Sequence, residues 1–329
     1  MGGSKRMPSP AAIDRFRADL ARVAPGKGRL ALAVSGGPDS MALLALAHAA
    51  LPAGTVIAAT VDHRLRPAAA DEAAMVARHC AAFGIPHAIL APSEPIAGAS
   101  IQARAREARY ALLSDWAREH GADALATAHH ADDQAETFVM RAARGSGVAG
   151  LSGVRGRAVI AGFPVVRPLL GWRRAELRAI AAAAGAPFVD DPSNADPRHD
   201  RTRFRELLAA TPALDPLALA QSAAALAEAE EALAWNVERL WAERARGDSP
   251  LILDVTGLPR ELRRRLARRA IAETRTRHAI TAPAWNEAAN IEPLLDSLEA
   301  ETRATQAGVM LTPRGDRWTI AKAPSRRSH

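Results

Sequence analysis

The chain has 329 residues, and its 43 lysine and arginine residues outnumber its 36 aspartate and glutamate residues by seven. This length favours two domains over one, and the basic balance favours a polyanionic partner such as nucleic acid, or an anionic membrane surface. The single cysteine, Cys80, excludes an internal disulfide and a cysteine-built zinc site, and the lack of a signal peptide or of ~20 consecutive apolar residues predicts a cytoplasmic protein that does not enter the membrane.

The first half of the sequence alternates short apolar runs with helical patterns. The expected strands cover residues 29–35, 55–63, 86–92 and 122–129, and the expected helices cover residues 41–51, 69–83, 101–120 and 131–145. This alternation predicts an α/β fold of the Rossmann-like kind, in which a parallel sheet carries helices on both faces. Such sheets bind their ligands at the carboxyl ends of the strands.

The pattern of the second half is mainly helical. A helix is expected over 172–184, and after a boundary near residue 212 further helices are expected over 217–245, 259–274 and 283–298. Residues 309–322 predict a terminal hairpin that turns at 314–316. We therefore predict an N-terminal domain over residues 1–212 and a smaller, mainly helical domain over residues 213–329. The arginine-rich helix of the second domain is either an RNA-binding surface or an exposed amphipathic helix.

The strongest local signal is the sequence SGGPDS at residues 35–40, between the first strand and its helix. Two glycines let the backbone approach a phosphate closely, and the N-terminus of a helix favours an anion. Asp39 would repel a phosphate unless a cation lay between them, so it predicts Mg²⁺. The sequence is neither a Walker A loop nor GxGxxG. The alternative is an ordinary strand–turn–helix cap, but the flanking strand and helix favour a phosphate loop.

Further polar motifs follow the later strands in a fixed order. They are VDHRLRP (61–67), IQARAREARY (101–110), TAHHADDQAET (127–137), RGSGVAGL (144–151), RPLL (167–170) and DDPSN (190–194). The SGGxDS loop resembles the PP-loop of the ATP-pyrophosphatase superfamily, and these motifs, over roughly residues 27–210, are similar to those of the tRNA(Ile)-lysidine synthase family. A departure is Thr202, because that family usually has asparagine after the arginine at position 201.

The resemblance implies a PP-loop fold and a ligase that forms a carbon–nitrogen bond. Members of the family adenylate the C2 oxygen of the wobble cytidine in the CAU-anticodon tRNA(Ile), using ATP and Mg²⁺, and the ε-amine of L-lysine then displaces AMP. The implied cofactors are therefore ATP and Mg²⁺, and the implied partners are L-lysine and this tRNA. The oligomeric state is left open, and a homodimer is compatible with the sequence.

The resemblance also implies roles for individual residues. Asp133 and Glu136 match the acids that handle lysine, and their spacing puts them on one helix face, although an acidic first turn also stabilises a helix dipole. Arg109 matches the residue that clamps the adenylated cytidine. His129 ends the fourth strand and is expected in the cleft, with His130 the less favoured partner. The triphosphate is expected on Ser35, Gly36, Gly37, Pro38, Asp39 and Ser40, with Asp39 also catalytic and holding Mg²⁺, and the ribose or adenine near Asp62 and His63.

Basic residues outside this cleft are candidates for RNA binding. Arg201, Arg203 and Arg205 form a basic run that could contact tRNA phosphates. Arg144 precedes a glycine turn, which approaches phosphate or RNA in one interpretation and simply caps a helix in the other.

Three other functions remain to be weighed. One is another PP-loop enzyme that thiolates tRNA or forms an amide, although thiolation needs catalytic cysteines that Cys80 alone does not supply. The second is a non-catalytic nucleotide-binding RNA module, against which the paired acids Asp133 and Glu136 argue. The third is zinc binding by the HHxDD sequence, which lacks a well-spaced further ligand set.

Overall fold

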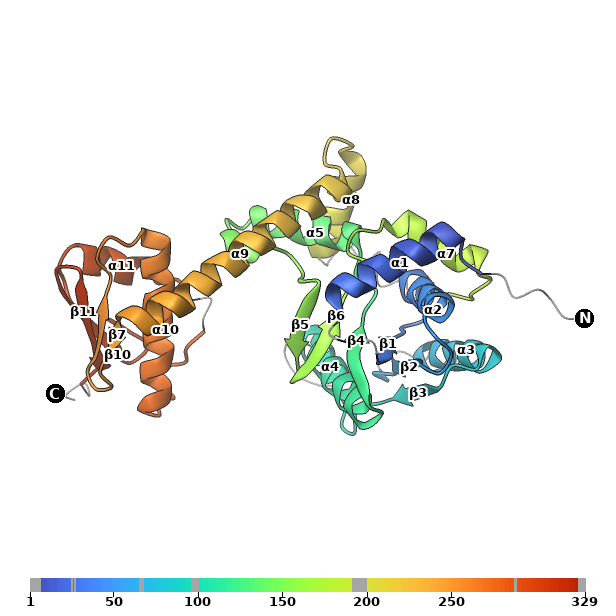
Figure 1. Cartoon of the computed structure of the whole chain (residues 1–329), viewed down its shortest axis with the longest axis horizontal. Helices are drawn as coiled ribbons and strands as arrows, with labels where there is room; N and C mark the ends of the chain where they lie inside the picture. Colours follow the sequence, from blue (N-terminus) through green and yellow to red (C-terminus); the bar gives the residue numbers. More distant parts are fainter. Residues whose placement is uncertain are drawn as a thin grey trace, which may run out of the picture. The chain divides into compact units, whose positions relative to one another are not determined.

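The computed structural model of the chain describes residues 7–24, 26, 28–64, 68–95, 101–190, 200–286 and 289–324 (Figure 1). The chain divides into two compact units, Met1–Ala227 and Glu228–His329. This division lies later than the predicted boundary near residue 212. Residues 213–227 stay with the first unit, where Ala220 and Ala223 are buried and Asp215 pairs with Arg173 at 3.4 Å. Among the described residues no helix is both long and apolar enough to span a bilayer.

The first unit is built on a six-stranded sheet in the order β3-β2-β1-β4-β6-β5. Its strands are β1 (Arg29–Ala33), β2 (Val56–Val61), β3 (His87–Leu90), β4 (Ala122–Ala126), β5 (Arg157–Ile160) and β6 (Phe163–Val166). All neighbouring pairs are parallel except the hairpin of β5 and β6. The four predicted strands and the α/β fold are confirmed. The strand order reverses between β1 and β4, which is where sheets of this kind bind ligands.

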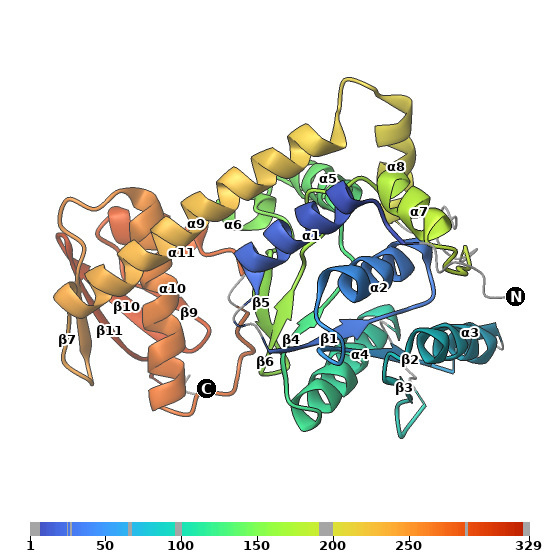
Figure 2. The ribbon, with the colours of Figure 1, turned by 45° about the vertical axis from the view of Figure 1, so that its right-hand side comes forward.

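Helices cover both faces of this sheet (Figure 2). One face is packed by α1 (Pro10–Val23), α2 (Pro38–Ala50), α3 (Ala68–Phe83) and α7 (Arg174–Ala183), and the other by α4 (Ile101–Glu119). The α2 helix is apolar all round because the sheet lies on one side of it while α1 and α7 contact it elsewhere. Beyond the strand ends, α5 (Ala131–Ala142) packs against α8 (Asp200–Ala210), and α6 (Val148–Leu151) follows α5.

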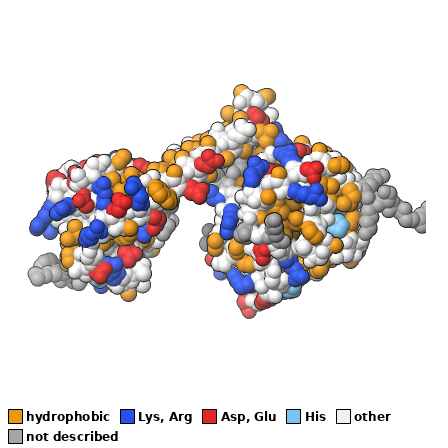
Figure 3. All heavy atoms as spheres, viewed as in Figure 1, with side chains coloured by type: hydrophobic (Ala, Val, Ile, Leu, Met, Phe, Trp, Pro, Cys, Tyr) orange, Lys and Arg blue, Asp and Glu red, His pale blue; other side chains and the backbone are white. Residues whose placement is uncertain are grey.

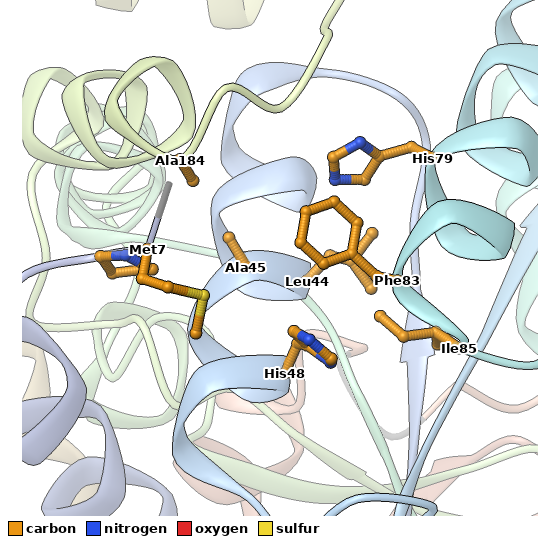
Figure 4. A pocket seen from close by; sticks show the side chains of 9 residues that line it. Met7, Leu44, Ala45, His48, His79, Phe83, Ile85 and Ala184 are labelled. Atoms are coloured by element: carbon orange, nitrogen blue, oxygen red, sulfur yellow. The ribbon is translucent and has the colours of Figure 1, made fainter. Parts of the chain in front are cut away.

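A small apolar pocket lies beside the C-terminal half of α2, away from the strand ends (Figure 4). His48 and His79 flank the ring of Phe83 there, with ring centroids 5.3 and 4.7 Å from it. Burial, followed by the proximity of His48, lowers the pKa of His79. These contacts join α2 to α3, so we interpret the pocket as a packing feature of the first unit.

The second unit combines helices with a five-stranded sheet in the order β7-β8-β11-β10-β9. The division between the units falls within α9 (Pro216–Arg244), and the other elements are β7 (Ala245–Arg246), β8 (Leu251–Asp254), α10 (Arg260–Arg277), α11 (Glu292–Glu299), β9 (Ala304–Gln306), β10 (Val309–Arg314) and β11 (Arg317–Lys322). The predicted hairpin is confirmed as β10 and β11. The strands β7, β8 and β9 are too short to give a periodic signal, and α11 begins later than the helix expected from residue 283.

The arginines of α10 form ion pairs inside the second unit. Arg264 and Arg265 donate to Glu292 and Glu230 at 2.6 Å, and Arg260 donates to Glu292 at 3.0 Å. In the view of Figure 3, basic and acidic side chains are interspersed over this unit rather than separated. These pairs give the arginines a structural role. RNA binding by this helix stays a prediction.

Candidate functional site

The predicted phosphate loop lies where the strand order of the first sheet reverses. It connects β1 to α2, and the segment that joins β4 to α5 carries His129 and His130 at the neighbouring strand end. Asp62 and His63 follow β2 on the other side of β1. The structure therefore gathers residues of three motifs at one edge of the sheet. Residues 65–67, which complete the motif of Asp62 and His63, and residues 191–194 of the DDPSN motif lie outside the described residues.

The backbone of the loop is arranged to expose amide groups at the start of α2. Gly36 has a φ of +86°, which a residue with a side chain rarely adopts. Gly37 is the N-cap of α2 and has no side chain to satisfy the first amides of the helix. The Ser40 hydroxyl ties the loop together, since it accepts from the Ser35 amide at 3.2 Å and donates to the Gly37 carbonyl at 3.0 Å. Such a turn suits a phosphate.

His130 connects the phosphate loop to α5. Its ring is buried, with Nε2 3.4 Å from Asp39 Oδ2 and 3.6 Å from Asp133 Oδ2. Nδ1 accepts from the Asp133 amide at 3.3 Å, and the Asp133 carboxylate accepts from the His130 amide at 3.1 Å, so the two residues cap α5 reciprocally. Burial opposes protonation, yet the nearby carboxylates of Asp39 and Asp133 raise the pKa of His130. The sequence favoured His129 for this cleft, but His130 makes the contact with Asp39.

His129 lies in a more cationic environment. Its Nδ1 is 2.9 Å from the Thr127 hydroxyl. Burial lowers its pKa to about 3, and nearby Arg167, Arg106 and Arg109 contribute to the shift against the opposing effect of Asp133. The imidazole is therefore neutral near pH 7, where it can exchange hydrogen bonds with a substrate but carries no charge.

Glu136 is a buried carboxylate held by three arginines. Its side chain is 2% exposed, and it accepts from Arg174 of α7 at 2.9 Å and from Arg201 and Arg205 of α8 at 2.9 and 2.8 Å. Although burial opposes ionisation, these guanidinium groups lower the pKa of Glu136 to about 2. Arg201 also donates to Asp133 at 2.9 Å. One guanidinium thus bridges the two acids that were expected to bind lysine.

This ion-pair network predicts an acid-sensitive fold. Because the pKa of Glu136 falls from 4.5 to about 2 on folding, its stabilising contribution is complete above pH 4.5 and is lost as the pH falls toward 2. We expect the difference in free energy of unfolding between the wild type and Glu136→Gln to shrink over this interval by about 3 kcal/mol. Urea unfolding at several pH values measures it, and Glu176→Gln, which removes a half-exposed pair with Arg15, is the control. A constant difference would contradict the assignment.

The other arginines proposed for RNA binding lie near one acid. Arg144 and Arg203 both pair with Asp200, Arg203 at 3.7 Å, and their side chains are 58% and 72% exposed. The α5 helix also ends as an ordinary glycine-capped helix, since Gly145 has a φ of +69° and the Ser146 amide donates to the Arg141 carbonyl. The side chains of Arg144 and Arg203 are accessible to RNA, and their RNA-binding role stays a prediction. Thr202, at the position of the usual asparagine, is buried on α8.

Arg109 and His63 lie close enough to influence each other electrostatically. The Arg109 guanidinium lies 5.3 Å from the centre of the Tyr110 ring, and burial followed by the charge of Arg109 lowers the pKa of His63. The Asp62 carboxylate accepts from the Arg64 amide at 2.8 Å.

The sequence patterns did not identify Arg174 as a site residue, because its contact with Glu136 depends on how α7 packs beside α5. Its only signal in the sequence is its position at the start of a helix.

The donor atoms present fit one hard cation better than a protein-built metal centre. Asp39 Oδ1 is buried and has no hydrogen-bond partner among the described residues. Within the same part of the chain no three histidine, cysteine or acidic side chains converge as metal ligands. Mg²⁺ is commonly held by one or two carboxylates together with substrate phosphates.

Cys80 is buried, and burial raises the pKa of its thiol to about 11, so it is a poor nucleophile.

Comparisons with known proteins agree with this geometry. Residues 11–211 match the model of a PP-loop domain. Over its length the chain is 45% identical to a tRNA(Ile)-lysidine synthase from Novosphingobium aromaticivorans, covering 96% of this chain and 95% of that protein. It is 42% identical to another from Zymomonas mobilis, covering 92% and 91%. The U34-tRNA thiolase NcsA from Methanococcus maripaludis shares the fold, with a TM-score of 0.55 and 19% identity over 66% of this chain and 78% of that one.

Proposed function

The chain belongs to the tRNA(Ile)-lysidine synthase family, and from this premise we propose that it ligates L-lysine to C2 of the wobble cytidine in the CAU-anticodon tRNA(Ile) at the expense of ATP. One observation carries the proposal: the phosphate loop and the acids of α5 meet at one sheet edge, where His130 lies between Asp39 and Asp133. A site with this arrangement has a nucleotide-binding half and an amine-binding half in contact.

In the first step the RNA is adenylated. The amides at the start of α2 bind the triphosphate and stabilise charge as it develops. The cytidine O2 attacks the α-phosphorus, so an O–P bond forms and the bond to the departing pyrophosphate breaks. The orphaned Asp39 oxygen fits a role in holding Mg²⁺, which when bound neutralises phosphate charge. Arg109 would hold the base, and neutral His129 would hydrogen-bond in the same cleft.

In the second step the amine of lysine replaces AMP. The ammonium group competes with the Arg201 guanidinium for the Asp133 carboxylate, which accepts a proton from it. The neutral amine then forms the N–C2 bond, and the C2–O bond to AMP breaks. Arg174 and Arg205 remain on Glu136 when Arg201 withdraws, so Glu136 keeps its countercharges. We therefore propose that Asp133 accepts the proton and that Glu136 positions the surrounding arginines.

The function is tested by incubating the protein with ATP, labelled lysine and the CAU isoleucine tRNA. Label that appears in the RNA supports the proposal, and the methionine tRNA, which shares the CAU anticodon, shows whether the chain selects its RNA. Sulfide-dependent turnover without lysine would instead identify a thiolase. Binding of ATP and RNA with no turnover would identify a non-catalytic module.

The link made by His130 gives a second test of the site. In His130→Asn a shorter side chain can still accept from the Asp133 amide and cap α5, but it cannot reach Asp39, whereas His130→Ala loses both contacts. We expect both variants to adenylate RNA at least about tenfold more slowly, and only His130→Ala to lose the further ~1 kcal/mol of a helix cap. Single-turnover pyrophosphate release and thermal unfolding measure the two effects.

The matched control for the cap is Ser9→Ala, which removes the N-cap of α1 far from the strand ends. It should lower stability without changing the adenylation rate. Adenylation at the wild-type rate in His130→Asn would show that the contact with Asp39 has no role in the reaction.

A further inference from the structure

Arg167 is a buried cation without a countercharge among the described residues. It follows β6 in the RPLL motif, for which the function above has no use. Its side chain is 3% exposed, its Nη1 donates to the Arg155 carbonyl at 2.6 Å, and its proximity to the Tyr110 hydroxyl contributes to lowering the pKa of that hydroxyl. Its Nε is buried without a partner. Burying a guanidinium without a countercharge is costly, so a bound anion would stabilise Arg167 in this position.

Two more arginines stand beside the ring of Tyr110, whose hydroxyl is also influenced by Arg167. The guanidinium carbons of Arg106 and Arg109 lie 5.1 and 5.3 Å from the centre of the Tyr110 ring. Burial raises the pKa of the Tyr110 hydroxyl, but the charges of these two arginines and of Arg167 outweigh it and lower the pKa overall. The same three arginines contribute to the low pKa of His129. No carboxylate of the described residues pairs with this group, which we call the arginine cluster.

The arginine cluster and the phosphate loop belong to elements that pack against opposite faces of the sheet. Tyr110 belongs to the hydrophobic core between the sheet and α4, whereas α2, which starts at the loop, packs in the core on the opposite face. The amides at the start of α2 already provide donors for a triphosphate. The arginine cluster offers further donors for a phosphate on the α4 side of the sheet, and the exposed Arg106 gives it access to solvent.

We propose that Arg167 and Arg106 bind a phosphodiester group of the substrate RNA, adjacent to the nucleotide whose base Arg109 holds. This inference rests on the proposed function. Arginine forks bind phosphate oxygens with two parallel hydrogen bonds, and the free Nε of Arg167 supplies a donor for such a pair. The cluster fixes the RNA backbone on the α4 side of the cleft, while ATP occupies the loop on the α2 side.

The test is equilibrium binding of the CAU tRNA at a series of salt concentrations, with ATP binding measured separately. We expect Arg167→Gln to weaken RNA binding at least about tenfold, and Arg167→Gln and Arg106→Gln each to reduce the slope of log affinity against log salt by about one. ATP affinity should stay unchanged. Arg106 is exposed, so its variant folds even if Arg167→Gln does not. The control is Arg118→Gln, at the other end of α4 and paired with Asp115, which should change neither affinity.

Two results would overturn the inference. Weaker ATP binding with unchanged RNA binding would show that the cluster holds the nucleotide. A loss of thermal stability in Arg167→Gln, with the RNA affinity and salt slope of both variants unchanged, would show a structural role. Because binding is measured without turnover, wild-type protein that binds tRNA but makes no lysidine would overturn the proposed function alone.

Discussion

Asp133→Asn should stop lysine transfer while leaving the adenylation of RNA nearly intact. The substitution keeps the shape of the side chain and an oxygen that can cap α5, but it removes the charge that we propose attracts the ammonium group and takes its proton. Without a proton acceptor the amine stays protonated, and we expect the second step to slow by about 10³-fold. Single-turnover assays separate the steps, because pyrophosphate release reports adenylation and labelled lysine in the RNA reports transfer.

A suitable control is Asp200→Asn. Asp200 is an acid of α8 that pairs with Arg144 and Arg203 but does not contact Asp133 or Glu136. The Asp200→Asn substitution removes one negative charge near the site, as Asp133→Asn does, and should leave the rates of adenylation and lysine transfer close to wild type. Equal losses of adenylation and transfer in Asp133→Asn would contradict a role confined to lysine.

Asp39→Asn should impair the adenylation step, whereas Asp133→Asn should impair lysine transfer. The carboxylate loses the charge that would hold Mg²⁺, while its place in the first turn of α2 is kept. We expect adenylation to slow by about 10³-fold and its dependence on Mg²⁺ concentration to change, with RNA affinity unaltered. Initial rates of pyrophosphate release across a magnesium titration provide the measurement.

Asp71→Asn serves as the matched variant, since Asp71 occupies the first turn of α3 and is exposed. It removes an equivalent favourable interaction with a helix N-terminus, so any general effect of the helix dipole appears in both variants. An Asp39→Asn protein with normal rates at every magnesium concentration would remove Asp39 from the mechanism.

Much of the first unit could be predicted because its signals are local. Buried parallel strands are short apolar runs, and a glycine loop between such a run and a helix needs no distant residue to be recognised. The hairpin of β10 and β11, in the second unit, was also predictable, because its two strands are neighbours in the sequence. The strands β5 and β6 lie in a region dense in glycine and proline, where turn signals conceal two four-residue strands.

The details of the site depend on contacts between residues far apart in sequence. His129 and His130 are neighbours, and only the path of the chain after β4 decides that His130 reaches Asp39. The sequence did not show that Arg201 and Arg205 pair with Glu136, because Glu136 lies 65 residues earlier than Arg201. Charge patterns show how many ions a segment carries, but the packing of α8 on α5 determines which of them meet.

The bridge that Arg201 makes between Asp133 and Glu136 bears on how the enzyme tells one free amino acid from another. A carboxylate pair that accommodates a guanidinium cannot reject arginine by charge alone. A guanidinium, however, does not give up its proton under physiological conditions, whereas an ammonium group beside a carboxylate can. If Asp133 and Glu136 bind lysine as we propose, fidelity toward lysine would depend on which bound amino acid can become a nucleophile, and arginine would occupy the site without being incorporated.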